Sequence, residues 1–254
     1  MKNYTAARER FAPAPRVNVV TRKEDIDPAR VDGQIVIVLD ILFATTTIVT
    51  ALEAGASMVI PAQDPNEARR IASALPPGGF HIAGEYRLAA IEGFATPMPL
   101  ELTRTPGFAG RPLVYSTTNG TVALRRSHGA VAIYAAALRN ASATLAHIRI
   151  HHRGLPLLIV CAGSSGALNL EDFYAAGCFV SLLGPDTDPA RDLSDTALAA
   201  LAAFRASDAA SALAASRVGR ICRGAGSGDE VSHAAQIDAS SLVARLRGDQ
   251  VVQV

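Results

Sequence analysis

The chain has 254 residues, of which 49% are hydrophobic and 19% are charged, and its formal net charge is +1. This composition excludes a disordered chain, because low hydrophobicity and high net charge are both absent. The balance of 24 basic against 23 acidic residues also argues against a general electrostatic binding of nucleic acid.

The length and the absence of a separating linker predict a single domain over residues 1–254, with residues 1–30 as a polar N-terminal arm. The three cysteines are widely spaced and match neither a disulfide framework nor a zinc site, which favours a reducing compartment. The N-terminus resembles no signal peptide, and no apolar run reaches the ~18 residues of a membrane span. These features predict a cytoplasmic protein without a membrane segment.

Units of one kind follow each other along the chain: a β-branched apolar run, a turn of small polar residues, and an Ala- and Leu-rich helix. We expect strands at 16–21, 34–40, 57–62, 80–84, 112–116, 130–137, 156–163 and 249–254. We expect helices at 48–55, 65–75, 122–129, 141–151, 170–184 and 195–217, with a further helix after the Gly-rich loop at 222–228. The segment 88–101 is expected to be a loop.

The expected strands are continuous apolar runs, which indicates a sheet that is covered on both faces. The predicted fold class is therefore α/β, as a three-layer α/β/α arrangement with a largely buried parallel or mixed sheet. Such sheets bind ligands beyond the carboxyl ends of their strands, where the turns lie. We therefore look for chemistry in those turns.

The first of these turns follows the strand at 34–40. Asp40 ends the strand, and an aspartate in this place can bind magnesium or act as a nucleophile. Thr45, Thr46 and Thr47 lie where the next helix begins, and hydroxyls beside free N–H groups favour an anion such as phosphate. The other interpretation is that one threonine caps the helix and Asp40 is only a turn residue.

A second turn, after the strand at 112–116, repeats this arrangement. Thr117, Thr118 and Asn119 offer hydrogen-bond donors for a phosphoryl group, and Gly120 can adopt a positive φ. An Asn-Gly pair is also typical of a hairpin turn. The helical pattern that follows favours anion binding instead.

Two further places carry charged residues that suit a phosphate site. Glu85 follows the strand at 80–84 and can ligate a metal, while Arg87 can pair with a phosphate, sulfonate or carboxylate. Read alone, the two residues favour a solvated ion pair over a functional role. Glu171 and Asp172 lie in the first turn of the helix at 170–184, where acids favour the helix dipole and where they can also add carboxylates to a cation site.

Cys161, before the turn Ala-Gly-Ser-Ser-Gly, suggests a thiolate nucleophile in a phosphate-binding loop. Cysteine phosphatases of that kind need an arginine after five intervening residues, and residue 167 is alanine. The sequence therefore favours a thiol that packs at the end of a strand. A thiolate mechanism stays the third hypothesis for this chain.

Four stretches, taken in order, resemble the 2-phosphosulfolactate phosphatase family. They are IVLDILFATTTIVTALEAGA, AGEYRLAAIEGFATPMPLE, STTNGTVAL with AAALRNA after it, and VCAGSSGALNLEDFYAAG, and they run from about residue 34 to about residue 180. The resemblance implies a magnesium-dependent phosphatase associated with coenzyme M biosynthesis, with Mg²⁺ as cofactor and a small anionic substrate.

The chain departs from the pattern of the family at several positions. The family usually shows an arginine where this chain has Phe43, and Gly-Glu-Arg where this chain has Tyr86 followed by Arg87. Its Gly-Phe-Asp and Gly-Asn-Ser-Pro motifs are here 93–95 and 96–99, which lack the Asp and the Asn-Ser pair. Each arginine that holds a phosphate contributes about 1.5–3 kcal/mol, so these changes predict a changed substrate or a lost activity unless another group compensates.

The main hypothesis is a magnesium-dependent phosphatase of a small phosphorylated acid. The predicted catalytic residues are Asp40, Glu85 and Asn119. The predicted substrate-binding residues are Thr45, Thr46, Arg87, Thr117, Thr118 and Gly120. The predicted metal ligands are Asp40, Glu85, Glu171 and Asp172.

The alternative hypothesis is a family member that has lost its chemistry and acts as a small-anion binding protein or as a partner protein. Whether identical chains assemble into an oligomer is left open by the sequence, as is the true substrate.

Overall fold

The computed structural model describes residues 16–29, 31–184, 187–188 and 192–254. Its strands are β1 (Val17–Val20), β2 (Ile35–Leu39), β3 (Val59–Ala62), β4 (His81–Tyr86), β5 (Ala89–Ala90), β6 (Leu113–Ser116), β7 (Ala132–Ala136), β8 (Leu157–Cys161), β9 (Ala244–Arg247) and β10 (Gln250–Gln253). They form one ten-stranded mixed sheet in the order β1-β8-β2-β7-β9-β10-β3-β6-β4-β5.

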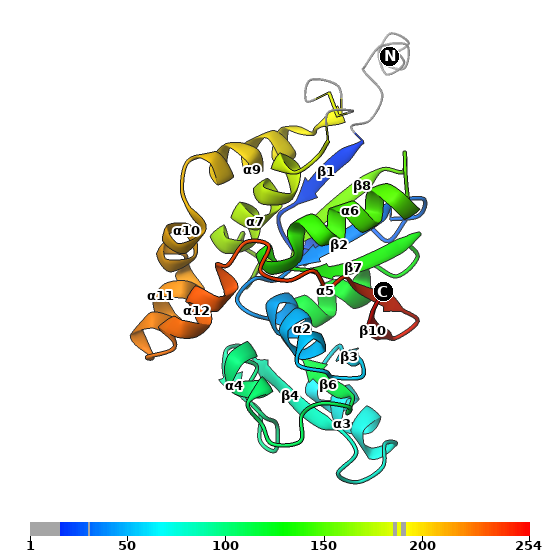
Figure 1. Ribbon diagram of the computed structural model, residues 1–254, viewed down its shortest axis with the longest axis vertical. Coiled ribbons are helices and arrows are strands. Elements are labelled where there is room, and N and C mark those ends of the chain that lie inside the picture. Colours follow the sequence, from blue (N-terminus) through cyan, green and yellow to red (C-terminus); the bar gives the residue numbers. More distant parts are fainter. Residues whose placement is uncertain (1–15, 30, 185–186, 189–191) are drawn as a thin grey trace, which may run out of the picture.

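The helices pack on this sheet and complete the three-layer α/β/α fold that the sequence predicts (Figure 1). The α-helices are α2 (Ala44–Glu53), α3 (Pro65–Ser73), α4 (Pro99–Thr103), α5 (Gly120–Arg126), α6 (Ala141–His151), α7 (Leu170–Ser181), α9 (Asp195–Arg205), α10 (Ala209–Ala215), α11 (Arg217–Gly224) and α12 (Gly228–Ala234). There are also two short 3₁₀ helices among the described residues: η1 (Lys23–Asp25), between β1 and β2, and η2 (Leu138–Asn140), between β7 and α6.

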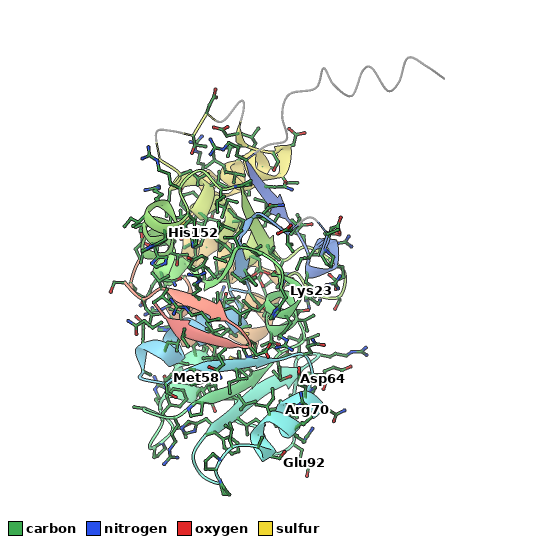
Figure 2. The ribbon with its side chains drawn as sticks, turned by 90° about the vertical axis from the view of Figure 1, so that its right-hand side faces the viewer. Lys23, Met58, Asp64, Arg70, Glu92 and His152 are labelled. Atoms are coloured by element: carbon green, nitrogen blue, oxygen red, sulfur yellow. The ribbon has the colours of Figure 1, made fainter. Side chains whose placement is uncertain are left out.

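The sheet consists of two groups of parallel strands. The first strand group is β1, β8, β2 and β7, and the second strand group is β3, β6 and β4. The antiparallel hairpin β9–β10 lies between them, pairing with β7 on one side and with β3 on the other. Figure 2 shows this hairpin in pale red across the middle of the molecule, with His152 on one side of it and Met58 on the other.

The hairpin reverses the direction of the second strand group. β9 is antiparallel to β7, β10 to β9, and β3 to β10, so β3, β6 and β4 run opposite to β2 along the sheet. The join between the two groups is narrow, because β10 and β3 share the single pair Val251 and Val59. The carboxyl ends of the two groups therefore come from opposite directions.

The core is centred on β2, whose five residues are all buried, as their unbroken apolar sequence predicts. Each residue of β2 pairs with β8 on one side and with β7 on the other. Ile159 and Tyr134, from these two neighbours, are completely buried. Asp40 follows directly after this strand, so a rigid and water-excluded element sets its position.

The structure corrects three expectations. The helix predicted at 195–217 is two helices, α9 and α10, bent by 107°. The break follows Arg205, because the side chain of Asp208 accepts a hydrogen bond from the N–H of Ser211 and begins a new helix there. β9 was not expected, and the predicted loop at 88–101 contains β5 and the start of α4.

Within the residues that the structure describes, no single helix is long and apolar enough to cross a membrane, and the bent pair α9 and α10 meets that test by length and composition alone.

Candidate active site

Asp40 lies at the point where the two strand groups meet. It follows β2 of the first group, it is buried, and its carboxyl group accepts hydrogen bonds from the backbone N–H groups of Ala44 and Gly120. Gly120 begins α5, directly after the turn that follows β6 of the second group. The carboxyl group of Asp40 thus connects the turns of strands that run in opposite directions.

Gly120 is required at this contact by space. A Cβ atom built on it would lie 2.4 Å from the Cβ of Ala44 and 2.8 Å from Oδ2 of Asp40, where any side chain would have to displace its neighbours. The sequence predicted Gly120 as a substrate-binding residue with a positive φ. In the structure its φ is not positive, and it lets the backbone of the second group approach Asp40.

The three threonines after Asp40 are buried, and their hydroxyls bond to backbone. Thr45 Oγ1 donates to the carbonyl of Asp40 at 3.0 Å, and Thr46 Oγ1 donates to that of Ile41 at 2.8 Å. Thr47 Oγ1 donates to the carbonyl of Pro97 at 2.7 Å. These hydroxyls hold the turn in place, and the role of Thr45 and Thr46 in substrate binding stays a prediction.

Glu85 joins β4 to the turn after β6. Its Oε1 accepts from the N–H of Thr118 at 2.6 Å, and its Oε2 accepts from the hydroxyl of Thr118 at 3.1 Å and from the N–H of Leu88 at 2.7 Å. The N–H of Arg87 donates to Thr118 Oγ1 at 2.7 Å. Arg87 and Leu88 form the tight turn between β4 and β5, with φ values of 53° and 66°, which non-glycine residues rarely adopt.

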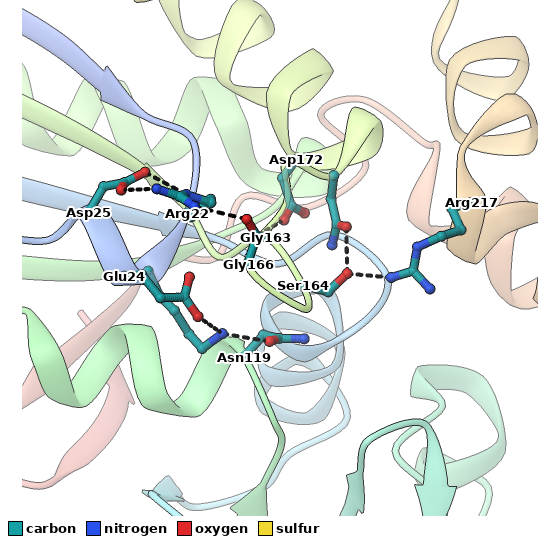
Figure 3. A network of polar contacts seen from close by, with 11 residues as sticks. Arg22, Glu24, Asp25, Asn119, Gly163, Ser164, Gly166, Asp172 and Arg217 are labelled. Atoms are coloured by element: carbon teal, nitrogen blue, oxygen red, sulfur yellow. Dashed lines mark hydrogen bonds and ion pairs between the residues drawn. The ribbon is translucent and has the colours of Figure 1, made fainter.

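Asn119 is oriented by a lysine that the sequence analysis did not single out. Lys23 Nζ donates to Oδ1 of Asn119 at 2.8 Å and to Glu24 Oε1 at 2.8 Å, as Figure 3 shows. Because Oδ1 accepts from Lys23, the amide nitrogen of Asn119 is the group that can donate to a ligand. Lys23 is buried, and it is one of only two lysines in the chain, the other being Lys2, a rarity that could have drawn attention to it.

Asp172 and Glu171 begin α7 and are buried, but they serve different neighbours. Asp172 Oδ1 accepts from the N–H of Ile41 at 2.8 Å, and its Oδ2 accepts from that of Gly163 at 3.2 Å. Asp172 therefore ties the turn after β2 to the turn after β8. Near Glu171, the guanidinium of Arg217 and the Ser216 hydroxyl favour the charged carboxylate.

Arg217 is a second basic residue that the sequence did not indicate, because the expected long helix hid its place at the start of α11. Its guanidinium donates to Ser164 Oγ, and Ser164 Oγ in turn donates to Oδ1 of Asn169 at 2.8 Å (Figure 3). Lys23, Arg217 and Ser164 thus come from η1, α11 and the turn after β8 and lie on one side of Asn119.

Two connected cavities open among these residues. The inner cavity has a volume of about 100 Å³ and is lined by polar residues that include Asp40, Thr117 and Asn169, and by apolar residues. The outer cavity has a volume of about 480 Å³ and includes Lys23 and Thr118 in its lining. Four residues line both cavities, namely Glu85, Leu88, Asn119 and Ser164.

Carboxyl groups are concentrated around Asp40, and their pKa values reflect this. Burial, together with the negative charges of Glu85 and Glu171, raises the pKa of Asp40 to about 7. Burial and the charges of Asp40 and Glu171 raise the pKa of Asp172 well above its usual range. Burial also raises the pKa of Glu171, and Ser216 and Arg217 offset part of this rise.

The four predicted metal ligands are not arranged as one closed metal site. Among the described residues, no group of three or more His, Cys, Asp or Glu side chains is placed to hold a metal ion. Both oxygens of Asp172 and of Glu85 accept hydrogen bonds from the protein. Of the four predicted ligands, Asp40 and Glu85 line the inner cavity.

Cys161 is an unsuitable nucleophile in this structure. It is completely buried at the end of β8, and burial, with the charges of Asp172 and Glu171, raises the pKa of its thiol well above the usual range. The thiolate is the reactive form, so this environment disfavours the chemistry. The alternative in the sequence analysis, that this thiol packs at a strand end, matches its position.

Comparison with known proteins finds one family along nearly the whole chain. Residues 20–249 match the model of the family described as 2-phosphosulpholactate phosphatase. A protein of Symbiobacterium thermophilum named probable 2-phosphosulfolactate phosphatase is 40% identical over 168 residues, which are 64% of this chain and 70% of that protein. Proteins of the same name from Thermotoga petrophila and Clostridium novyi are 37% and 31% identical, over 67% and 73% of this chain and 69% and 77% of theirs.

Proposed function

The chain belongs to the 2-phosphosulpholactate phosphatase family, and on that basis we propose that it is a magnesium-dependent phosphatase of a small phosphorylated acid. In this reaction water attacks phosphorus, the bond from phosphorus to the ester oxygen breaks, and a proton passes to the leaving oxygen. The products are the free hydroxy acid and inorganic phosphate. We place the activity in the cytoplasm, which agrees with three free cysteines.

The observation that carries the proposal is the position of Asp40 at the inner cavity, beside Asn119. Lys23 holds the amide of Asn119 so that its nitrogen can donate to a phosphoryl oxygen. The hydroxyl of Thr117, which accepts from the N–H of Thr121 at 3.2 Å, lines the same cavity. Fixed donors of this kind stabilise the charge that develops on phosphoryl oxygens.

The donor set suits a magnesium ion that is held by few protein ligands. Mg²⁺ prefers oxygen ligands and commonly takes one or two carboxylates together with substrate phosphate and water. Asp40 supplies such a carboxylate; burial and the charges of Glu85 and Glu171 raise its pKa to about 7, and a bound cation would offset both effects. When bound, the ion would polarise the phosphoryl group and lower the pKa of a water molecule. Asp40 and Glu85 would hold it, while Glu171 and Asp172 would add negative charge around it.

Phosphate release from 2-phosphosulfolactate tests the proposal, measured on the purified protein with Mg²⁺ and with a chelator. We expect release that depends on magnesium and that falls about a thousandfold or more in Asp40→Asn. Asp195→Asn changes an exposed aspartate on α9 and serves as the matched control. If no phosphate ester is hydrolysed faster than by Asp40→Asn, the proposal is wrong and the hypothesis of a non-catalytic anion-binding protein takes its place.

A further inference from the structure

The two cavities differ in charge. The outer cavity is lined by three basic side chains and two carboxylates, namely Lys23, Arg87, Arg217, Glu24 and Glu85. The inner cavity has no lysine or arginine among its lining residues. The charged side chains that line the inner cavity are those of Asp40 and Glu85. A carboxylate of a ligand can therefore find protein cations in the outer cavity, whereas Asp40 and Glu85 repel it from the inner cavity. The phosphoryl group, placed beside Asp40, relies on the cation proposed there.

One wall of the inner cavity is apolar. Leu42, Phe43, Met98, Val218 and Cys222 contribute to it, and they come from the turn after β2, the residue before α4, and α11. All except Met98 are buried. A charged group that is pressed against such a wall loses its hydration without gaining a partner, which costs several kcal/mol. An apolar group of the same size gains free energy there.

The outer cavity offers a place for one carboxylate. Lys23 Nζ already donates to Asn119 and Glu24, and an ammonium group has three protons, so one is left to give. Arg217 donates to Ser164 through one nitrogen, which leaves further N–H groups of its guanidinium for a carboxylate. Asn119 and Ser164 line both cavities, so a ligand at these residues can contact both.

We propose that the substrate is the phosphate ester of a 2-hydroxy acid with an apolar substituent. Its carboxylate lies in the outer cavity near Lys23 and Arg217, its phosphoryl group lies at Asn119 beside Asp40, and its apolar substituent lies in the inner cavity against Phe43. This inference rests on the proposed phosphatase activity and names the substrate class. Phe43, which stands where the family usually shows an arginine, selects an uncharged substituent.

The inner cavity also limits the size of this substituent. Its volume of about 100 Å³ is room for about three groups of the size of water, each of which takes about 30 Å³ of the liquid. The phosphoryl group occupies part of the same cavity, so we expect a small substituent such as a methyl, ethyl or isopropyl group. The sulfonate of 2-phosphosulfolactate fits by size but carries a charge.

Hydrolysis of matched esters tests the substituent. We expect kcat/KM for the phosphate esters of lactate and 2-hydroxyisovalerate to exceed that for 2-phosphosulfolactate by about tenfold or more, because a hydrophobic pocket discriminates by about that factor per group. In Phe43→Arg the order is expected to reverse. Ile150→Arg adds the same charge at an exposed position on α6 and is expected to keep the order of the unchanged enzyme.

A higher kcat/KM for 2-phosphosulfolactate than for both apolar esters overturns this inference and leaves the proposed phosphatase activity standing. The same order in Phe43→Arg as in the unchanged enzyme also contradicts it, provided that the melting temperature shows a folded variant. Hydrolysis of none of the esters overturns the phosphatase activity and, with it, this inference.

Lys23→Met tests the place of the carboxylate, because methionine keeps an unbranched side chain that is one atom shorter and removes the charge. We expect KM for the lactate ester to rise about tenfold, the loss of one charge-assisted hydrogen bond. For 4-nitrophenyl phosphate, which has no carboxylate, KM should rise less than for the lactate ester, because only the hydrogen bond from Lys23 to Asn119 is lost there. Equal increases for both esters would show that Lys23 acts on the phosphoryl group or on Asn119, and would contradict the assignment.

Discussion

The two strand groups hold their site residues in different ways. In the first group, Asp40 and Asp172 are buried, and the carboxylate of Asp172 on α7 accepts a hydrogen bond from the backbone N–H of Ile41, the residue after Asp40. In the second group, Glu85 is partly exposed and holds a turn whose tip, Leu88, is 59% exposed. The first half is thus acidic and buried and the second is more exposed, which agrees with the proposal that the first carries the chemistry and the second admits the substrate.

The largest expected effect comes from forcing the two groups apart with Gly120→Ala. The new Cβ would lie 2.4 Å from that of Ala44 and would press against the carboxyl group of Asp40. Overpacking of this kind costs about 1–3 kcal/mol of unfolding free energy, and a misplacement by about 1 Å costs about 100-fold in kcat. Urea denaturation and phosphate release measure both. Gly224→Ala is the control, since a Cβ at Gly224 meets no atom within 4 Å; equal losses in both variants would contradict the contact.

The next largest effect is on the free energy of unfolding, when the buried carboxylate of Asp172 in the first group or the partly exposed carboxylate of Glu85 in the second is removed. Asp172→Ala leaves the N–H groups of Ile41 and Gly163 without an acceptor, at about 1–3 kcal/mol each. Glu85→Ala also frees N–H groups, but water reaches them, so we expect a smaller loss. Urea denaturation of the two variants and of the unchanged protein at one pH gives the two values. A larger loss in Glu85→Ala would contradict this order.

A moderate effect of pH on the free energy of unfolding is expected, and its source is Asp40 in the first strand group. The pKa of Asp40 is about 7 in the folded protein and about 3.9 in an unfolded chain. Between these values the folded state binds more protons, so the contribution of Asp40 to stability falls as pH rises through this window. Asp40→Asn should flatten the fall, measured as urea midpoints at pH 5 and 8 without divalent cations. An unchanged slope in this variant would mean that Asp40 titrates normally.

The smallest effect is the difference in stability and KM between valine substitutions of two threonines of α2. Thr46→Val removes a hydroxyl that bonds to the carbonyl of Ile41, so we expect a loss of about 1 kcal/mol and no change in KM beyond about twofold. Thr47→Val removes one of the two hydrogen bonds to the carbonyl of Pro97, and the hydroxyl of Tyr115 keeps the other. Because Pro97 lines the inner cavity, this variant should raise KM more. A tenfold rise of KM in Thr46→Val would instead support the prediction that this hydroxyl binds the substrate.

The sequence predicts the parts of this site that depend on local pattern. Asp40 and Asn119 follow apolar strands, and a residue after a strand in an α/β sheet is a candidate on that ground alone. It cannot predict that the two strands run in opposite directions, because this follows from the pairing of β9 and β10 with strands far away in the chain.

The basic residues of the outer cavity are harder to predict. Lys23 belongs to the segment that was expected to be an arm, and it becomes part of the site because η1 contacts α5 and Lys23 reaches Asn119. Arg217 was expected inside a long alanine-rich helix. Its position depends on the caps formed by Asp208 and Ser216, which divide that helix. Both residues reach the site through tertiary contacts that have no local signature.

The hairpin β9–β10 also has a consequence for protein synthesis. Every other strand precedes it in the chain, and yet it lies between the two strand groups. While the chain is being made, β3 cannot connect to the rest of the sheet until residues 244–253 have left the ribosome. The nascent protein must therefore keep two incomplete sheets with open edges, and such edges attract other strands. Chaperone binding, or slow translation of the last part of the chain, would therefore reduce aggregation of this protein more than that of a protein whose neighbouring strands follow each other in sequence.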